Sequence, residues 1–376
     1  MLCAQENVEL LNALLAGNTA SVEARTNTAH FDYGQFGAFT DLHHLSGYLY
    51  LHIKGTPIED FLPQEFLEHL GERYSLQRQR CDDALREAVL IYDTFRAAHQ
   101  DVLFLKGSFV AQQFYGDIHQ RSYWDVDILI PRDNLTVADQ LLRNVGFKRL
   151  SMVFVSNGAM TRFTHTYDYS KRIADEARPG HQKVMPLDLH WGLRTHFSFH
   201  LDNENIWKQQ QECQLAGRPF RVLSAEYTLV LNMLGIFFDI ELGTIRLKSF
   251  VDLYKMLEVM DPNMDWDAFF KKRTQENILL ITVNVIDLVL SVLDCRSKFP
   301  GMALYLEKNR GLIRLKDARD KYRLLDSSRV SMSNRRWAHS LYQATVLQSF
   351  LWALVSLPFR IAAHDRVVQK FMGRLK

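Results

Sequence analysis

Two aspartates one residue apart, Asp125 and Asp127, are the residues of this chain best suited to metal chemistry. They lie in the run 124–130, whose apolar and β-branched residues predict a strand. Because side chains alternate between the faces of a strand, both carboxylates would project from one face while Val126 and Ile128 project to the core. The two Cα atoms would be about 6 to 7 Å apart. A Mg²⁺ ion is usually held by one or two carboxylates together with substrate phosphates, so the pair predicts a divalent-cation site.

A glycine–serine turn precedes the acid pair. The apolar run 101–106 predicts a strand and the spacing over 108–115 predicts a helix, so Gly107 and Ser108 would form a strand-to-helix turn. Glycine lets the backbone approach a ligand closely, and the N–H groups and dipole at a helix start favour an anion. The turn therefore predicts phosphate binding. The alternatives are that Ser108 is only an N-cap and Gly107 only a turn residue.

A third carboxylate, Asp188, lies in the extended run 184–191. Its leucines would face the core, while Asp188 and His190 would share the opposite face. Pro186 suggests that this strand is short or begins there. Two-metal sites normally need an additional carboxylate on the acceptor side, and Asp188 is the candidate.

The order of these features favours chemistry over a solvated strand face, which is the commoner explanation of an isolated Asp-x-Asp. A turn opening a helix is followed by paired acids on one strand and by a single acid on a later strand. That order is typical of a metal-dependent nucleotidyl-transfer site.

Five segments carry a resemblance to a bacterial nucleotidyltransferase-like family of the DNA polymerase β-like nucleotidyltransferase superfamily: Leu105-Lys-Gly-Ser, Tyr115-Gly-Asp117, Arg121, Asp125-Val-Asp-Ile-Leu-Ile130 and Leu187-Asp-Leu-His-Trp191. The resemblance covers residues 101–191 and implies an α+β fold with a polymerase β-like core. It implies that Asp125 and Asp127 are metal ligands and that Asp188 is the third carboxylate. It also implies that Gly107 and Ser108 form the triphosphate-binding turn.

Three basic residues are further candidates for nucleotide binding: Lys106, Arg121 and Lys248. Lys106 precedes the turn and could meet a phosphate, although a lysine at a strand end is as often solvated. Arg121 could neutralise a triphosphate or pair with Asp117. Lys248 could reach a phosphate or form an ion pair with Asp252 at i,i+4.

Histidines suggest two other possibilities. His190 could contact the acceptor or the nucleotide, but a core histidine satisfied by the backbone is the favoured interpretation. His190, His196 and His200 suggest zinc because the last two are four residues apart. No cysteine or acid pair at ligand spacing accompanies them, which argues against zinc.

The pattern along the chain predicts three regions: a helical region over 1–97, a nucleotidyltransferase core over 98–223, and a helical region with a basic tail over 224–376. In the core we expect strands at 101–106, 125–130, 148–156, 162–169 and 184–191, helices at 108–115 and 135–144, and a loop at 173–181. Outside it we expect helices at 7–15, 63–99, 227–238, 246–260, 266–273 and 278–293.

Composition agrees with a folded enzyme. The 376 residues are 47% hydrophobic, enough for a substantial core. Four dispersed cysteines, no Cys-x-x-Cys pair and no secretory signal predict a cytoplasmic protein, and no transmembrane segment is expected.

Charge is unevenly distributed. Residues 310–376 hold fourteen Lys and Arg against four Asp and Glu, although the net charge of the chain is only +2. Within this region the run 344–363 is apolar and is followed by basic residues. It could be a helix docked on the acidic remainder, an arm that binds RNA, or a helix on an anionic membrane surface. Docking is the favoured interpretation.

Together these features predict an enzyme that transfers a nucleoside monophosphate from an NTP to an unidentified acceptor (a small molecule, a protein or RNA), with Mg²⁺ as cofactor and Mn²⁺ as a possible substitute. Pyrophosphate would be released. The alternatives are a non-catalytic nucleotide-binding or scaffold protein and a toxin-like nucleotidyltransferase that modifies RNA.

Overall fold

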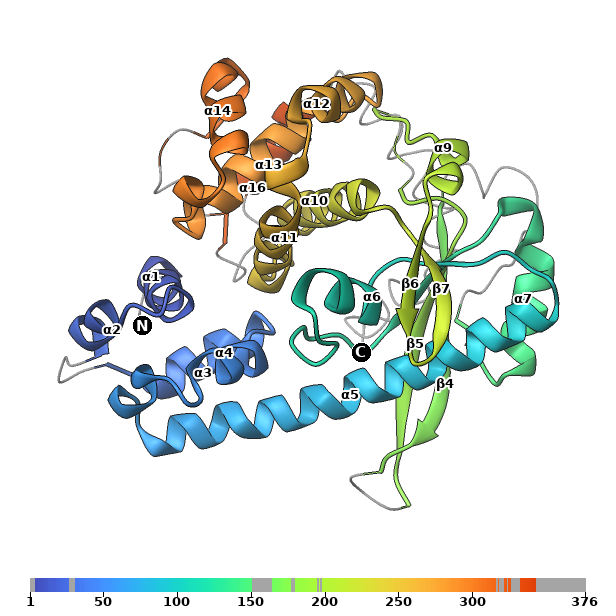
Figure 1. The fold of residues 1–376 in the computed structure, drawn as a ribbon, viewed down its shortest axis with the longest axis horizontal. Coiled ribbons are helices and arrows are strands. Elements are labelled where there is room, and N and C mark those ends of the chain that lie inside the picture. The colour runs from blue at the N-terminus through green and yellow to red at the C-terminus, as the bar shows by residue number, and fades with distance from the viewer. Residues whose placement is uncertain are drawn as a thin grey trace. The chain divides into compact units, whose positions relative to one another are not determined.

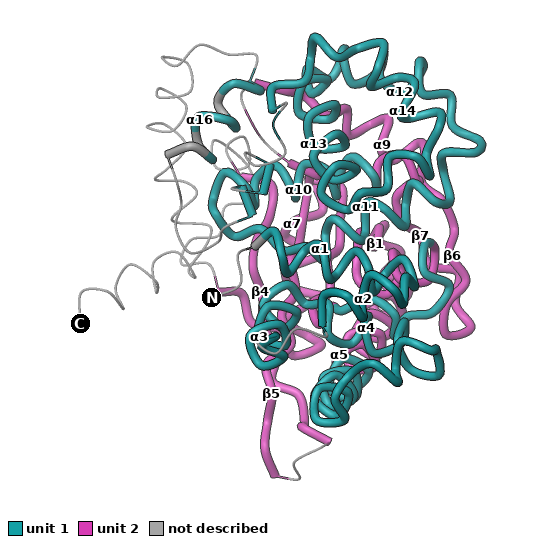
Figure 2. The backbone as a smooth tube through the Cα atoms, turned by 90° about the vertical axis from the view of Figure 1, so that its left-hand side faces the viewer, with its two compact units in different colours: residues 1–79, 114–122, 229–343 teal, residues 80–113, 123–228, 344–376 magenta. Residues whose placement is uncertain are grey.

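A computed structural model describes residues 4–26, 31–150, 164–176, 180–194, 196, 198–315, 317, 321–322, 324–325 and 332–342. The described residues form two compact units (Figure 2). We call the described parts of 1–79, 114–122 and 229–343 the helical unit and those of 80–113 and 123–228 the sheet unit. The three-region division expected from the sequence stays a prediction. Among the described helices, none is long and apolar enough to cross a membrane.

The helical unit draws its helices from both ends of the chain (Figure 1). They are α1 (Ala4–Leu15), α2 (Thr19–Thr26), α3 (Tyr33–Leu42), α4 (Ser46–Ile53), the first half of α5 (Gln64–Ala97), most of α10 (Ala225–Leu242), α11 (Leu247–Met260), α12 (Trp266–Gln275), α13 (Leu279–Val292), α14 (Pro300–Lys308) and α16 (Met332–Leu341). Asp32 and Asp265 each accept a hydrogen bond from a backbone N–H of the first turn, which caps α3 and α12. The predicted helices of this part are confirmed, while α2, α3, α4, α14 and α16 were not predicted.

The sheet unit is built on one seven-stranded mixed sheet with the order β3-β4-β5-β2-β1-β7-β6. Its strands are β1 (Leu103–Phe104), β2 (Val126–Leu129), β3 (Lys148–Arg149), β4 (Thr166–Ala174), β5 (Gln182–His190), β6 (Gln211–Leu215) and β7 (Arg218–Val222). The pairs β2–β5 and β1–β7 are parallel and the others are antiparallel. This mixed sheet with helices confirms the expected α+β class.

Alternation along the central strands decides which face of the sheet is core. Val126 and Ile128 of β2, with Leu187 and Leu189 of β5, belong to one buried apolar cluster. Residues 80–97 of α5 and helix α7 (Leu135–Asn144) supply apolar side chains to the same cluster. The intervening residues of β2 and β5 therefore project from the opposite face.

Strands β1 and β2 are shorter than the predicted runs 101–106 and 125–130, and the two strands beside the expected loop extend further into it. Strand β4 continues through the first part of the expected loop to Ala174. Strand β5 begins at Gln182 and passes through Pro186. Strand β5 pairs with β2 only from Leu187 onward, so Pro186 has no paired residue on the β2 side. The missing N–H of the proline therefore removes no hydrogen bond between β5 and β2.

The hairpin β6–β7 was missed from the sequence. Its two-residue turn, Ala216-Gly217, has φ angles of 50° and 70°, the left-handed conformation that such hairpins favour. Two predicted segments lie outside the described residues: 151–156 of one expected strand, and the apolar run 344–363. The expected docking of the run 344–363 is therefore not tested.

Candidate active site

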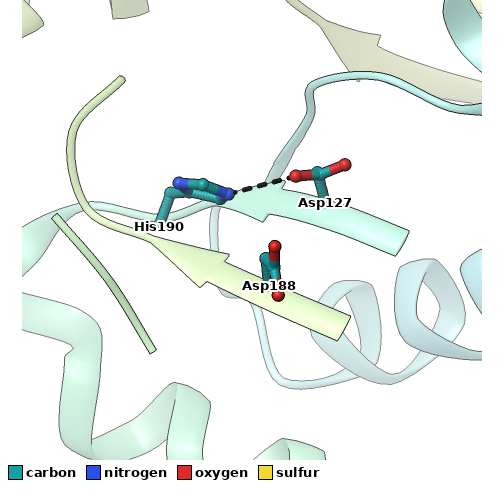
Figure 3. Close-up of side chains that lie close together, drawn as sticks. All are labelled: Asp127, Asp188 and His190. Atoms are coloured by element: carbon teal, nitrogen blue, oxygen red, sulfur yellow. Dashed lines mark hydrogen bonds and ion pairs between the residues drawn. The ribbon is translucent and has the colours of Figure 1, made fainter. Parts of the chain in front are cut away.

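The carboxylates of Asp127 and Asp188 lie side by side. Asp127 of β2 pairs with Asp188 of β5 in the parallel ladder, so both side chains project from the face opposite the apolar cluster. His190, two residues further along β5, projects from that face too. One ligand atom from each of the three lies within 4.8 Å of the others (Figure 3). Among the described residues this is the only group of three or more such side chains close enough to share a metal ion.

Asp127 is held as a carboxylate. Its side chain is 2% exposed, and its Oδ1 lies 3.2 Å from Lys106 Nζ and 3.2 Å from His190 Nε2. Burial alone would raise the pKa of Asp127, but the Lys106 ammonium and the His190 hydrogen bond outweigh it and hold the pKa well below its usual range. Lys106, predicted as a nucleotide-binding residue, therefore lies at the acid pair and is not merely solvated.

Asp188 has the opposite environment. Its Oδ1 is enclosed and has no hydrogen-bond partner. Burial, followed by the negative charges of Asp127, Asp168 and Asp125, raises the pKa of Asp188 well above its usual range. The site thus combines an ionised carboxylate with one that resists ionisation.

His190 is not satisfied by the backbone, so the favoured sequence interpretation was wrong. Its Nε2 bonds to Asp127, and its Nδ1 is buried with no hydrogen-bond partner. Burial lowers the pKa of His190, although Asp127 opposes the shift. A neutral ring that donates from Nε2 to Asp127 leaves Nδ1 as an acceptor.

Gly107 forms the predicted turn and needs to be glycine. Its φ of 60° and ψ of −125° form a conformation that other residues rarely adopt. A Cβ there would lie 3.3 Å from the ring of Tyr123 and 3.5 Å from the backbone oxygen of Asp125. The turn and the first predicted metal ligand are thus in contact.

Ser108 is the first residue of α6 (Ser108–Val110), which continues as the π-helical turn η2 (Ala111–Tyr115). Gly107 occupies the N-cap position, so Ser108 is not the cap that the alternative interpretation assumed. Ser108 is buried. The strand, turn and helix follow one another as predicted.

Asp125 directly precedes β2 and is half-buried. It is not one of the three side chains within 4.8 Å of one another, but its charge contributes to the raised pKa of Asp188. Its role as a metal ligand stays a prediction.

Arg121 and Lys248 both belong to the helical unit. Arg121 donates from Nε and one terminal nitrogen to the two carboxylate oxygens of Asp252, at 2.8 and 2.9 Å, and the Tyr115 hydroxyl donates to Asp252 at 2.7 Å. Lys248 donates to the backbone oxygen of Ser122. These contacts differ from the pairs Arg121–Asp117 and Lys248–Asp252 that the sequence offered as alternatives to phosphate binding. Nucleotide binding by Arg121 and Lys248 stays a prediction.

Asp168 was not predicted from the sequence, yet it lies on β4 directly opposite Asp188 and is 7% exposed. A signal was present, since this Asp stands between two buried tyrosines, Tyr167 and Tyr169, but a local pattern does not identify the strand with which it pairs.

The zinc alternative gains no support, since His196 interacts through Nδ1 with Ser198 and is not in the metal-capable group.

Comparison with known proteins assigns the family. A family described as "Uncharacterised nucleotidyltransferase" matches residues 29–294. No curated protein resembles the sequence closely enough to count as a match. Two solved structures share some similarity. An antigenic nucleotidyltransferase-like protein from Paracoccidioides brasiliensis is 14% identical with a TM-score of 0.31, over 51% of this chain and 88% of that one. JHP933 from Helicobacter pylori is 12% identical with a TM-score of 0.33, over 73% of this chain and 97% of that one. Because the family match spans most of the chain and includes the strands that carry the acids, the chain belongs to this family of nucleotidyltransferases.

Proposed function

We propose that this enzyme transfers a nucleoside monophosphate from an NTP to an acceptor hydroxyl or related nucleophile in a reaction that depends on Mg²⁺, with Mn²⁺ as a possible substitute. The observation that carries the proposal is the registered pair Asp127–Asp188, whose ligand atoms lie within 4.8 Å of each other. The acceptor atom would form a bond to the α-phosphorus, the bond from that phosphorus to the α–β bridging oxygen would break, and pyrophosphate would leave.

The residues present suit a hard divalent cation. Asp188 has an enclosed carboxylate oxygen without a hydrogen-bond partner, and oxygen ligands are those that Mg²⁺ and Mn²⁺ prefer. Asp125, Asp127 and Asp188 would hold the metal. Bound metal would neutralise the charge that develops on the phosphates during transfer.

The side chains around the acids have distinct proposed tasks. Lys106 and His190 keep Asp127 ionised and fix its orientation. Gly107 and Ser108 would receive the β and γ phosphates on their backbone N–H groups. Asp188 would lie on the acceptor side, where its carboxylate would take the proton of the attacking hydroxyl. A cytoplasmic location and an acidic partner for the basic tail, RNA or an anionic membrane surface, remain proposals from the sequence.

The test is a label-transfer assay. Purified full-length protein is incubated with Mg²⁺, with each of four α-labelled NTPs in turn, and with fractions of a cell lysate. We expect label to enter one class of acceptor with one preferred base, and pyrophosphate to be released in equal amount. The variant Asp133→Asn, which removes a charge at an exposed position of η3 (Arg132–Asn134), is the control and should transfer normally. Tight binding of Mg·NTP without transfer to any fraction would favour the non-catalytic alternative.

A further inference from the structure

A cavity of about 560 Å³ lies in the helical unit, and all of its described lining residues belong to that unit. Its walls come from α1, α2, α4, α11 and the turn after α13, so segments from both ends of the chain build it. Pockets for small ligands typically measure about 300 to 1,000 Å³. The cavity therefore has the size to hold a small molecule, and none of the residues assigned to nucleotidyl transfer lines it.

The charged side chains of the lining are balanced in sign. Three are acidic and three are basic: Glu9, Glu258 and Asp294, and Arg25, Lys255 and Lys298. Arg25 pairs with Glu9 at 2.7 Å. Lys255 pairs with Glu258 at 2.6 Å. Asp294 and Lys298 form no ion pair with any residue that the structure describes. A ligand that carries one positive and one negative group would complement both.

Asn12 adds an unused hydrogen-bond acceptor to the lining. Its Nδ2 donates to the backbone oxygen of Val292 at 2.8 Å, which fixes the orientation of the amide. Its Oδ1 is enclosed and has no hydrogen-bond partner among the described residues. Val292 ends α13 and Asp294 follows two residues later, so the amide of Asn12 is anchored beside the segment that carries the unpaired carboxylate. An ammonium group would donate hydrogen bonds to both.

The backbone of Asp294 supports a role for its carboxylate. Its φ is 47°, at the position after a helix where glycine is usual. The N–H of Cys295 donates to the backbone oxygen of Leu290, the hydrogen bond that completes such a helix end. Because an aspartate is less favourable than glycine in this conformation, stability alone does not account for Asp294.

The opposite charge and an apolar surface complete the cavity. Lys298 donates from Nζ to the Tyr254 hydroxyl at 3.0 Å, which holds its ammonium group at the lining. A carboxylate bound there would form the charge-assisted hydrogen bond that Lys298 lacks. Tyr48 and Val251 are 4% and 2% exposed and supply apolar surface. Burial, followed by the charge of Glu258, raises the pKa of Tyr48 well above its usual range, so its hydroxyl stays neutral.

We propose that this cavity binds a free α-amino acid, whose ammonium group would meet Asp294 and Asn12 and whose carboxylate would meet Lys298. The side chain of the amino acid would lie against Tyr48 and Val251. This proposal does not depend on nucleotidyl transfer, because the two sets of residues do not overlap.

Calorimetry with the full-length protein and each of the twenty standard amino acids tests the proposal. We expect at least one of them to bind with one molecule per chain. Analogues of that amino acid without the ammonium group, or without the carboxylate, should bind at least about tenfold more weakly, the loss expected for one hydrogen bond to a charged group.

Two variants assign the ends of the ligand. Asp294→Asn and Lys298→Met should each weaken binding of the amino acid about tenfold. Asp294→Asn should also lose its preference over the analogue without the ammonium group. Asp267→Asn and Lys308→Met are the controls, because they remove the same charges from exposed positions outside the lining, and both should bind as the wild type does.

Three results would overturn the proposal. They are no binding of any amino acid to the wild type, unchanged affinity in both Asp294→Asn and Lys298→Met, and binding of either analogue as tight as that of the amino acid. Circular dichroism checks the fold of each variant. If Asp294→Asn does not fold, Asp294→Gly replaces it, because glycine suits the positive φ at this position.

Discussion

Asp127 and Asp188 face each other across parallel strands, yet their surroundings shift their pKa values in opposite directions. Asp127 is buried against Lys106 and His190, which favour its charged form. Asp188 is half-buried among other acids, which disfavour its charged form. Divergent pKa values in neighbouring acids are a frequent property of active sites, because they assign different tasks to similar groups.

The first prediction separates nucleotide binding from chemistry. In the proposed mechanism the triphosphate-side cation would depend mainly on Asp125 and Asp127, so Asp188→Asn should still bind Mg·NTP. Its turnover should fall by at least a hundredfold, about 2.7 kcal/mol in the activation free energy. Asp127→Asn should lose both. Calorimetry with Mg·NTP and the label-transfer assay measure the two properties. Loss of nucleotide binding in Asp188→Asn would show that its assignment to the acceptor side is wrong.

The second prediction concerns pH and stability in the absence of metal. The folded-state pKa of Asp188 is raised, so on raising the pH above the usual Asp value of 3.8 the unfolded chain releases this proton before the folded chain does. Asp188 therefore contributes a loss of stability as the pH rises, up to its folded-state pKa. We expect Asp188→Asn to remove this loss, so that its melting temperature in EDTA exceeds that of the wild type by more at pH 7 than at pH 4.

The comparison uses full melting curves from pH 4 to 8. Asp133→Asn is the matched control, because it removes a carboxylate from an exposed position. If wild type and Asp188→Asn show a constant difference over this range, Asp188 is already ionised in the folded protein and the cause assigned to its environment is wrong.

How much of this site could be predicted depends on the range of the interactions. Asp127 and Asp188 were found because alternation along a strand is a local pattern, and Gly107 because a glycine between a strand and a helix is a local signal. Asp168 was missed because its position opposite Asp188 depends on the register of two strands, which no single segment contains. The partner of Arg121 was missed for a similar reason, since Asp252 is 131 residues away.

The third prediction concerns the turn. Gly107→Ala adds a methyl group 3.3 Å from Tyr123 in a backbone conformation that disfavours any side chain, and the strain should cost of order 1 to 3 kcal/mol. Displacement of the turn should also weaken NTP binding. Gly217→Ala is a matched control, because Gly217 also has a positive φ but its added methyl group would meet no atom within 4 Å.

Both variants are compared by urea unfolding and by calorimetry with Mg·NTP. We expect both to lose stability and only Gly107→Ala to lose nucleotide affinity. Equal affinities in the two variants would mean that the turn at Gly107 does not hold the triphosphate.

The last prediction decides between two roles for Arg121. Arg121 and Asp252 form a buried bidentate pair, with side chains 8% and 1% exposed. Removing one partner of a buried pair leaves the other charge uncompensated and typically costs about 3 to 5 kcal/mol, so Asp252→Asn should lower the melting temperature strongly. Replacing the whole group by apolar residues of similar size is often neutral, so Arg121→Met combined with Asp252→Leu and Tyr115→Phe should recover most of that stability.

This triple variant separates the charge of Arg121 from its contribution to stability. If Arg121 only stabilises the helical unit, this variant should bind Mg·NTP as the wild type does. A tenfold or greater loss of affinity in a variant that melts normally would instead assign Arg121 to the nucleotide, as the sequence predicts.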